Sequence, residues 1–326
     1  MKELLIVIPS FISIQINTNK LISESRKVMG QLIYLAAPNK EKSKDELITS
    51  KFAGNSCSMQ GWRKSMEDAH VMYSDDQLSL FAVFDGHGGS EVAKYCGKNV
   101  VDVFKSIEKE KSGNIKDALI ETFLKLDENM LKEAGQKELR EFKDNPEGEM
   151  LAGCTANVAV LVNGELYVAN AGDSRAVINS GGIAVEMSID HKPDDKDEQD
   201  RIQSAGGFIS EGRVNGNLNL SRALGDFEYK RDAALEPKQQ IITCYPDVRV
   251  RQITPNDEFL IMGCDGIWET KSNQEMVDYI KEKLQKGFDA GTVLEHLLDD
   301  LCAVDSLSAA GKGCDNMSSV LIIFKH

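Results

Sequence analysis

The sequence lacks the features that mark several classes of protein. It has no apolar run of the ~18–20 residues that a membrane-spanning helix needs, so we expect no transmembrane segment. No Cys-x-x-Cys pair occurs among the seven cysteines, and their odd number does not suit a disulfide framework or a zinc site. The cysteines therefore favour a reducing compartment, and we expect a cytoplasmic protein, with the nucleus as an alternative.

Basic residues are also too few for a nucleic-acid-binding protein. Lys and Arg number 38 against 52 for Asp and Glu, which gives a net charge of −14. Because nucleic-acid phosphates need a basic surface, no nucleic-acid partner is expected. The surplus of carboxylates suits a protein that gathers acidic side chains around divalent cations, and we expect most of it to lie on a solvated surface.

The chain divides into two parts of different character. With 326 residues, 41% of them hydrophobic, it can bury a large core in one β-rich domain. We place this domain at residues 51–326 and interpret residues 1–50 as an accessory or poorly ordered extension. The apolar stretch Leu4–Ile16 contains proline and serine and lacks a small-x-small cleavage pattern, so it does not match a signal peptide. Met29 is an alternative start, and Lys40–Glu46 is expected to be a charged linker.

From residue 50 onward the pattern is mainly that of strands, with a few long helices. Asn163-Gly164 between two apolar runs predicts a two-residue hairpin, and hairpins in series predict antiparallel sheet. Ser90 is expected to cap a helix, and Ser272 with Glu275 forms a capping box for another. Sheets that are buried on one face and covered by helices predict a layered α+β sandwich.

One stretch organises the candidate site. Leu80–Phe84 is an apolar, β-favouring run, and Asp85-Gly86-His87-Gly88-Gly89 follows it directly. The glycines indicate a sharp loop in which the backbone can approach a ligand closely. A carboxylate and an imidazole thus directly follow the C-terminal end of a rigid strand, a position that suits a metal ligand and a proton donor. The alternative is a tight turn with a solvated histidine.

Other acidic residues stand beside apolar runs in the same way. Asp265 follows one run, Asp315 precedes another, and Glu67 lies in Arg-Lys-Ser-Met-Glu-Asp. Since the end of one antiparallel strand lies beside the start of its neighbour, we expect these carboxylates to converge with Asp85. Like charges in one pocket are unstable unless some of the carboxylates are protonated or cations bind, and an all-oxygen ligand set indicates magnesium or manganese. Two such ions would lower the pKa of a bridging water and supply a hydroxide that attacks phosphorus.

Two further side chains have the chemistry for a phosphate substrate. Arg63 can hold phosphate oxygens with its guanidinium fork, and His87 can protonate the leaving oxygen. The plainer alternatives are a surface ion pair for Arg63 and a loop histidine held by a backbone carbonyl for His87. A rival chemistry is a cysteine nucleophile, because five residues separate Cys57 from Arg63. The interval contains one glycine and no helix signal follows it, so we interpret this spacing as chance.

These motifs, in this order, resemble those of the metal-dependent protein serine/threonine phosphatases of type 2C, the PPM family. The resemblance runs from about Ser50 to the C-terminus, and its motifs are residues 63–68, 80–89, 170–175, 259–269 and 314–324. It implies a helix–sheet–sheet–helix sandwich with two antiparallel sheets and a mobile flap at about residues 190–246. It also implies hydrolysis of phosphoserine and phosphothreonine in phosphoprotein substrates by a monomer without a dedicated regulatory subunit.

The resemblance implies a role for each site residue. The residues that would hold two ions, magnesium or manganese, are Glu67, Asp85, Gly86, Asp265 and Asp315. Asp173 would help to hold a third, weaker ion, and Asp68 would orient water on the ions. Thr155 and Asn316 would hydrogen-bond the ligands from behind. The phosphate-binding arginine and the proton-donating histidine keep the roles given above.

The sequence departs from the family pattern at one position. Glu269 stands where the family usually has aspartate, and its longer side chain puts the third ion in question. An alternative function is a regulatory pseudophosphatase that keeps the fold and binds a partner. That function predicts missing metal ligands, and none is missing from the sequence.

Overall fold

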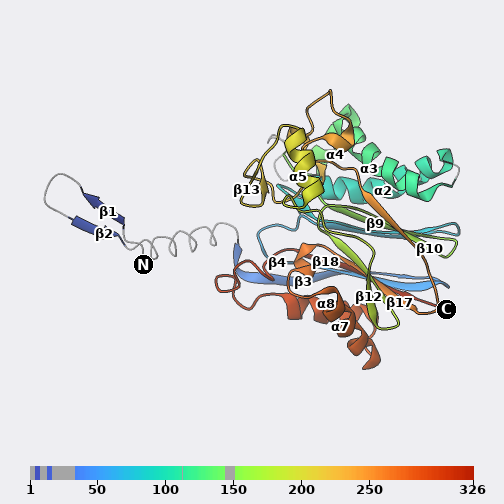
Figure 1. The fold of residues 1–326 in the computed structure, drawn as a ribbon. Coiled ribbons are helices and arrows are strands. Elements are labelled where there is room, and N and C mark those ends of the chain that lie inside the picture. Colours follow the sequence, from blue (N-terminus) through green and yellow to red (C-terminus); the bar gives the residue numbers. More distant parts are fainter. Residues whose placement is uncertain (1–3, 8–12, 17–33, 112, 144–150) are drawn as a thin grey trace.

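Two antiparallel sheets lie face to face at the centre of the molecule (Figure 1). The computed structural model describes residues 4–7, 13–16, 34–111, 113–143 and 151–326. The five-stranded sheet contains, in spatial order, β16 (Asp247–Gln252), β10 (Glu165–Ala171), β9 (Ala156–Val162), β6 (Ser79–Phe84) and β5 (Ala69–Ser74). The six-stranded sheet contains, in spatial order, β12 (Ile183–Glu186), β11 (Arg175–Ser180), β17 (Asp257–Gly263), β18 (Met317–Phe324), β4 (Phe52–Arg63) and β3 (Tyr34–Ile48).

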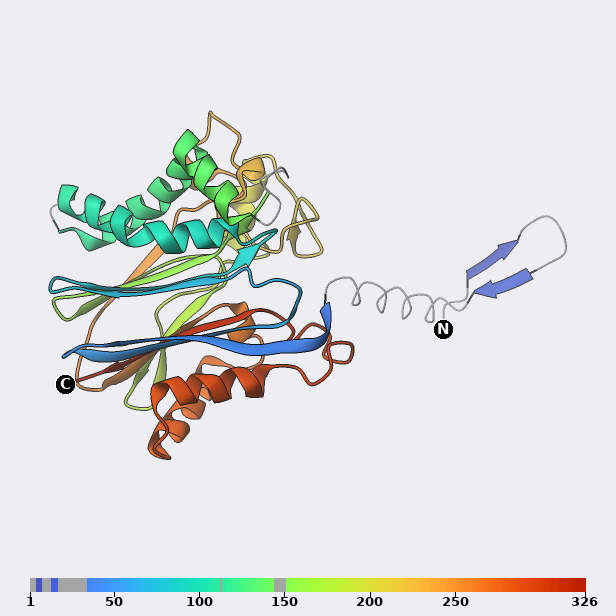
Figure 2. The ribbon, with the colours of Figure 1, turned by 180° about the vertical axis from the view of Figure 1, so that it is seen from behind.

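Helices cover the outer face of each sheet, as both views of the ribbon show (Figure 1, Figure 2). On the five-stranded sheet lie α2 (Glu91–Glu110) and α3 (Ile115–Leu131), and α4 (Glu133–Phe142) packs against these two helices. On the six-stranded sheet lie α7 (Asn273–Gln285) and α8 (Ala290–Leu301). The predicted helix–sheet–sheet–helix sandwich with two antiparallel sheets is therefore confirmed.

The ends of two helices test the capping predictions. The capping box of α7 is present, because Ser272 Oγ accepts from the Glu275 amide at 3.3 Å and Glu275 Oε2 accepts from the Ser272 amide at 2.8 Å. The prediction for Ser90 is wrong in its chemistry. Ser90 precedes α2, but its side chain makes no capping hydrogen bond.

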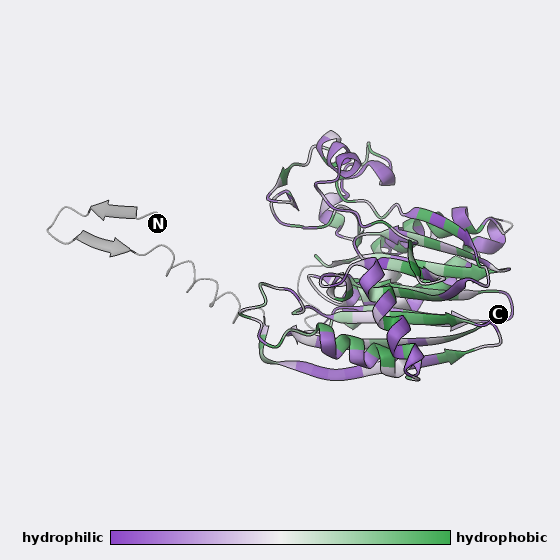
Figure 3. Cartoon of the chain, turned by 60° about the horizontal axis from the view of Figure 1, so that its bottom comes forward, coloured by the Kyte–Doolittle hydropathy of each residue, from purple (hydrophilic) through white to green (hydrophobic). Residues whose placement is uncertain are grey.

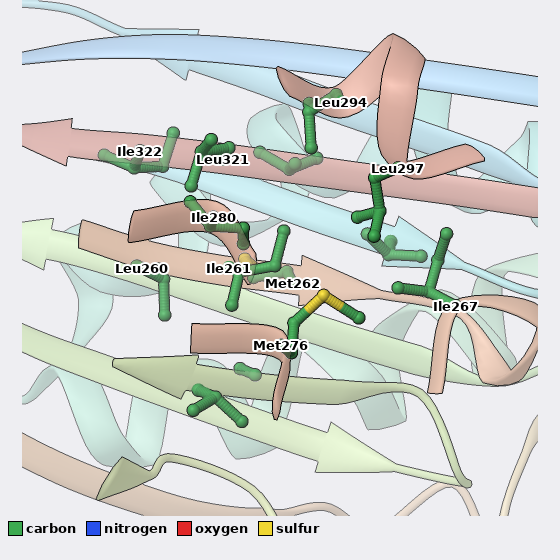
Figure 4. Close-up of a cluster of buried hydrophobic side chains, with 14 of the residues drawn as sticks. Leu260, Ile261, Met262, Ile267, Met276, Ile280, Leu294, Leu297, Leu321 and Ile322 are labelled. Carbon is green, nitrogen blue, oxygen red and sulfur yellow. The ribbon is translucent and has the colours of Figure 1, made fainter. Parts of the chain in front are cut away.

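The core explains the continuous apolar run of β6. Leu80, Ala82 and Phe84 pack under the helices α2 and α3, while Phe81 and Val83 face the other sheet, so both faces of the strand are buried. Figure 3 shows hydrophobic residues concentrated in the central strands and hydrophilic residues on the surrounding helices. Figure 4 shows the corresponding cluster on the other side, where side chains of α7 and α8 meet those of β17 and β18.

Strand β3 corrects one prediction from the sequence. Residues 40–46, expected to form a charged linker, belong to this long edge strand, which pairs with β4 in antiparallel register. Its lysines reach acidic residues of α8, as in the contact of Lys42 Nζ with Asp299 Oδ1 at 2.9 Å. The strand is largely exposed and its lysines contact acidic residues of a helix. Its sequence therefore lacks the alternation of apolar and polar residues that would have predicted a strand. The sheet thus begins at Tyr34, although the division of the chain near residue 50 stays a prediction.

The flap region, residues 190–246, forms a small unit of its own. It contains α5 (Lys196–Ser204), β13 (Ile209–Ser210), β14 (Arg213–Val214), β15 (Leu224–Gly225), η1 (Phe227–Tyr229) and η2 (Pro237–Gln239). A separate hydrophobic cluster, centred on Ile202 and Ile242, holds it together. In a three-stranded sheet, β15 pairs with β8 (Gly153–Cys154), which pairs with β7 (Gly86–His87).

Three short elements complete the described chain. Near the N-terminus, β1 (Leu4–Val7) pairs antiparallel with β2 (Ser13–Ile16). After β17, the single-turn helix α6 (Asp265–Trp268) carries one of the predicted ligands at its first position. Within the described ranges, none of the helices combines the length and apolar character needed to cross a bilayer.

Candidate active site

A pocket of about 300 Å³ opens where loops from both sheets meet. The predicted site residues that line it are Arg63, Glu67, Asp85, Gly86, His87, Thr155, Asp173, Asp265, Asp315 and Asn316. Asn219 and Leu220 of the flap region complete its wall, so this region lies beside the site, as the family resemblance implies. The remaining predicted residues, Asp68 and Glu269, lie close to the acidic side chains of the pocket.

The order of the strands explains why distant acidic residues meet. Asp265 follows β17 and Asp315 precedes β18, and these strands are neighbours, with Gly263 opposite Ser319. Arg63 ends β4, the next strand of the same sheet. Asp85 follows β6 of the opposite sheet, so the pocket is built from both halves of the sandwich.

The acidic side chains form a compact set of oxygen atoms. Asp265, Glu269 and Asp315 each offer a carboxylate oxygen within 4.8 Å of the others. A carboxylate oxygen of Asp85, one of Asp265 and the Cys264 sulfur also lie within 4.8 Å of one another. Burial, together with the negative charge of neighbouring aspartates, raises the pKa of both Asp85 and Asp265 well above its usual range. Burial also raises the pKa of the Cys264 thiol, which keeps it protonated and makes it a poor ligand.

Asp68 is a buried acidic residue close to these groups. Its side chain is 7% exposed, and neither of its oxygens has a hydrogen-bond partner in the described part of the chain. Burial raises its pKa to about 7. A buried carboxylate with free oxygens fits a place where an ion or its water would complete the hydrogen bonding.

Glu67 is oriented by several hydrogen bonds. Ser65 Oγ donates to its Oε1 at 2.8 Å, and the amide of Gly89 donates to its Oε2 at 3.1 Å. Its own amide donates to Asn316 Oδ1 at 2.9 Å. Gly86 is required beside it, because a Cβ there would lie 2.2 Å from the carbonyl oxygen of Glu67.

Asn316 and Thr155 make hydrogen bonds to the backbone around the acidic residues, and their role behind metal ligands stays a prediction. Asn316 Nδ2 donates to the carbonyls of Gln60 and Ser65, at 2.8 and 3.0 Å, and so ties the loop after β4 to the start of β18. Thr155 Oγ1 accepts from the Asp85 amide at 3.3 Å, and it lies 2.7 Å from Ser174 Oγ. Both side chains thereby hold the backbone that carries the acidic residues.

Three cationic side chains contact acidic residues around the pocket. Arg63 Nη2 lies 2.6 Å from Asp315 Oδ2, and Lys192 of the flap region contacts Asp173. His87 Nε2 lies 2.8 Å from Asp226 Oδ2. Burial alone would lower the pKa of His87, but the charge of Asp226 and its hydrogen bond outweigh it, and the pKa is raised.

Asp226 and Lys192 are site residues that the sequence reasoning missed. Asp226 follows a short strand with no apolar periodicity, and it lies 139 positions from its partner His87. Lys192 follows Asp190-His191, a motif that indicates a turn but names no partner. The sequence carries no local signal for either contact.

The rival cysteine nucleophile finds no support. Cys57 is fully buried in the core between β4 and its neighbours, and burial raises the pKa of its thiol to about 11. Cys57 and Arg63 lie on the same strand, β4, so the residues between them form no phosphate-binding loop.

Comparisons with known proteins were made with this geometry in view. Residues 52–309 match the family described as protein phosphatase 2C. Probable protein phosphatase 2C 5 of Paramecium tetraurelia is 47% identical over 294 residues, which cover 90% of this chain and 99% of the relative. Protein phosphatase 2C homolog 2 of Schizosaccharomyces pombe is 44% identical over 277 residues, covering 82% of this chain and 72% of the relative.

Solved structures agree in fold. The crystal structure of serine-threonine phosphatase 2C from Toxoplasma gondii matches with a TM-score of 0.69 at 22% sequence identity. The match covers 87% of this chain and 99% of that one. A second Toxoplasma gondii phosphatase structure matches with a TM-score of 0.71 at 23% identity, covering 87% of this chain and 96% of that one.

Proposed function

Because this chain belongs to the protein phosphatase 2C family and is a protein serine/threonine phosphatase, we propose that it hydrolyses its phosphoprotein substrates with two divalent ions, magnesium or manganese. The observation that carries this proposal is the set of carboxylates that line or border one pocket, in which Asp68 is buried with free oxygen atoms and the pKa values of Asp85 and Asp265 are raised. Such a set is unfavourable without cations, and its oxygen donors are those that magnesium and manganese prefer.

The residues that would hold the two ions are Glu67, Asp85, the Gly86 carbonyl, Asp265 and Asp315. Asp173 and Glu269 would help to hold a third, weaker ion. When bound, the ions would supply a water of lowered pKa as the nucleophile near neutral pH. Asp68, whose oxygens are free and which borders the acidic set, is suited to orient that water.

Arg63 and His87 act on the substrate in this proposal. The Arg63 guanidinium stands at the pocket wall, where its fork can hold two phosphate oxygens. His87 lines the same pocket, and its imidazolium can give a proton to the serine or threonine oxygen as the bond to phosphorus breaks. All of these groups belong to one chain, which supports activity as a monomer without a regulatory subunit.

The pseudophosphatase alternative is less well supported. It predicts that one or more of the acidic positions is lost or turned away, whereas the aspartates and the glutamate converge on one pocket. Catalysis therefore explains the arrangement better than partner binding alone.

Hydrolysis of a phosphothreonine peptide tests the proposal. The purified chain should release phosphate with added Mn²⁺ or Mg²⁺ and lose this activity in EDTA. Cys57→Ser is the matched control, and it should retain nearly full turnover because that thiol is buried away from the pocket. Full activity in the chelator, or no activity with either metal, would overturn the proposal.

A further inference from the structure

A buried carboxylate of the flap region contacts the His87 side chain of the active site. Asp226 directly follows β15, and its side chain is 3% exposed. Its Oδ2 lies 2.8 Å from Nε2 of the imidazole, which is a short hydrogen bond between a carboxylate and a ring nitrogen. No motif in the sequence indicates this contact, and the roles proposed above do not use it.

The central strand of the small sheet is shaped to let this contact form. In the order β15-β8-β7, Gly153 of β8 stands between Gly225 and His87 and pairs with both. A Cβ on Gly153 would lie 2.3 Å from Asp226 Oδ2 and 2.6 Å from His87 Nε2. Gly153 is not among the residues with positive φ, so space, not backbone conformation, requires glycine here.

Asp226 is also held in an unusual backbone conformation. Its φ of 48° and ψ of 41° lie in the left-handed region, which few residues other than glycine adopt and in which asparagine and aspartate are the commonest exceptions. Neighbouring contacts fix it there, because its amide donates to the Ala152 carbonyl at 3.2 Å and the Gly225 amide donates to Asp127 Oδ1 at 2.8 Å. Lys230 then bridges Asp127 of α3 to the carbonyl of Ala223. The carboxylate is therefore placed by both the sandwich and the flap region.

We propose that Asp226 is a positioning residue for proton transfer. Its carboxylate accepts a hydrogen bond from Nε2–H of His87, which leaves Nδ1 as the ring nitrogen that faces the substrate. The proposal rests on the proposed function, in which His87 is the proton donor. In the step itself, Nδ1 of the imidazolium gives its proton to the serine or threonine oxygen as the oxygen–phosphorus bond breaks. The ring ends neutral, with its remaining proton on Nε2 still bound to Asp226. A carboxylate behind a histidine fixes the tautomer and orientation of the ring in this way.

Variants at Asp226 and Gly153 separate this role from a merely structural one. Asp226→Asn and Asp226→Gly remove the charge and suit the left-handed backbone, and Gly153→Ala pushes the two side chains apart. Asp232→Asn is the control, since the side chain of this exposed aspartate of the same region accepts from the Ala234 amide and lies outside the His87 contact. Each is compared on a phosphothreonine peptide, whose leaving oxygen needs a proton, and on nitrophenyl phosphate, whose leaving group does not.

We expect the Asp226 variants and Gly153→Ala to lower kcat on the peptide by about 10–100-fold, the usual range for a group that orients a catalytic side chain. Loss on nitrophenyl phosphate should be small. In a His87→Ala background, Asp226→Gly should cause no further loss, because the two residues act as one unit. Equal losses of kcat on both substrates would overturn the proposal. So would a double variant whose loss of kcat equals the His87→Ala loss multiplied by the Asp226→Gly loss.

Nitrogen NMR of the histidine rings gives a readout that does not depend on activity. The chain has five histidines, and the His87 signals are assigned by their absence in His87→Ala. The neutral ring should carry its proton on Nε2 in the wild type and become a mixture of tautomers in Asp226→Gly. An unchanged tautomer would overturn the positioning role even if activity fell. If His87→Ala lost equally on both substrates, the proton donor itself would be misassigned, while metal-dependent hydrolysis would still stand.

Discussion

Two acidic regions of the molecule, the flap region and the pocket, each include a buried carboxylate, and the two carboxylates differ in their partners. In the flap region, Glu198 is bound by two arginines, with Arg222 Nη2 at 2.6 Å and Arg201 Nη1 at 2.8 Å. Burial alone would raise its pKa, but the hydrogen bonds and charges of the arginines lower it to about 2. In the pocket, burial raises the pKa of Asp68 to about 7, because no arginine or lysine binds it.

The difference shows what each group is for. Buried carboxylates are stable when protein cations compensate them, and the flap region is complete in this respect. The pocket leaves Asp68, Asp85 and Asp265 without such compensation, which is costly unless other cations take the place of arginine. The same substitution should therefore have opposite effects on stability in the two groups.

The largest effect is expected for activity when a pocket carboxylate is neutralised. Asp85→Asn or Asp265→Asn should lower turnover on a phosphothreonine peptide at least about 100-fold, since even groups behind metal ligands are typically worth 10–100-fold. Without metal, thermal unfolding should shift to a higher temperature, because a buried like charge is removed. Asp299→Asn, on the exposed side of α8, is the control. Near wild-type turnover at saturating metal would show that the residue is not a ligand.

In the flap region the sign for stability should reverse. Glu198→Gln removes the carboxylate that binds both Arg201 and Arg222, which are mostly buried, and leaves Arg222 only its contact with the exposed Asp247. The free energy of unfolding should fall by about 3 kcal/mol or more, as is usual when one partner of a buried ion pair is removed. Urea denaturation measures it against Glu236→Gln, which removes an exposed pair with Lys238. An unchanged free energy of unfolding in Glu198→Gln would show that the flap region and the pocket do not differ in this way.

The pH dependence of stability sharpens the comparison further. The folded pKa of Glu198, about 2, lies below its ordinary value of 4.5, so its contribution is present above pH 4.5 and is lost as the pH falls toward 2. The wild type should lose on the order of 3 kcal/mol more than Glu198→Gln across this window. Denaturation at a series of pH values from 5 to about 2 measures the difference, and parallel curves for the two proteins would argue against it.

The smallest effect is expected at Glu269, where the pocket departs from its family's usual aspartate. Its carboxylate lies among the oxygens of Asp265 and Asp315 and also accepts from the Gly313 amide at 3.3 Å. Glu269→Asp shortens the side chain and lowers the entropy lost on ordering it, so the third ion should bind more tightly. The metal concentration for half-maximal activity should fall, and Asp173→Ala should cancel that gain. A titration curve that Glu269→Asp leaves unchanged would indicate that Glu269 does not share an ion.

Much of the fold and the acidic set could be predicted from local patterns. The strand that ends at Phe84 and the loop of Asp85 carry a sharp change from apolar residues to glycine, and antiparallel pairing brings Asp265 beside Asp315. These signals lie within a few residues of each other in the chain. They need no knowledge of tertiary contacts beyond the sheet.

The features that escaped prediction depend on contacts between distant segments. Strand β3 is exposed and charged, and it is defined only by its pairing with β4 and by lysine contacts to α8. Asp226 is placed by a glycine on another strand and by a backbone conformation that no local pattern indicates. Ser90 has the residue type of a cap but makes no capping bond. The contacts that these side chains make are determined by the packing of distant segments, not by the residue type alone.

Titration of Mn²⁺ into chelator-treated protein is the most direct test that the acidic pocket works by holding metal ions. Calorimetry and peptide hydrolysis are followed on the same samples, for the wild type and for Asp265→Asn. Two ions should bind the wild-type pocket, activity should rise from zero as they bind, and Asp265→Asn should lose both signals. Hydrolysis that persists in the chelator and is abolished by thiol alkylation would contradict it.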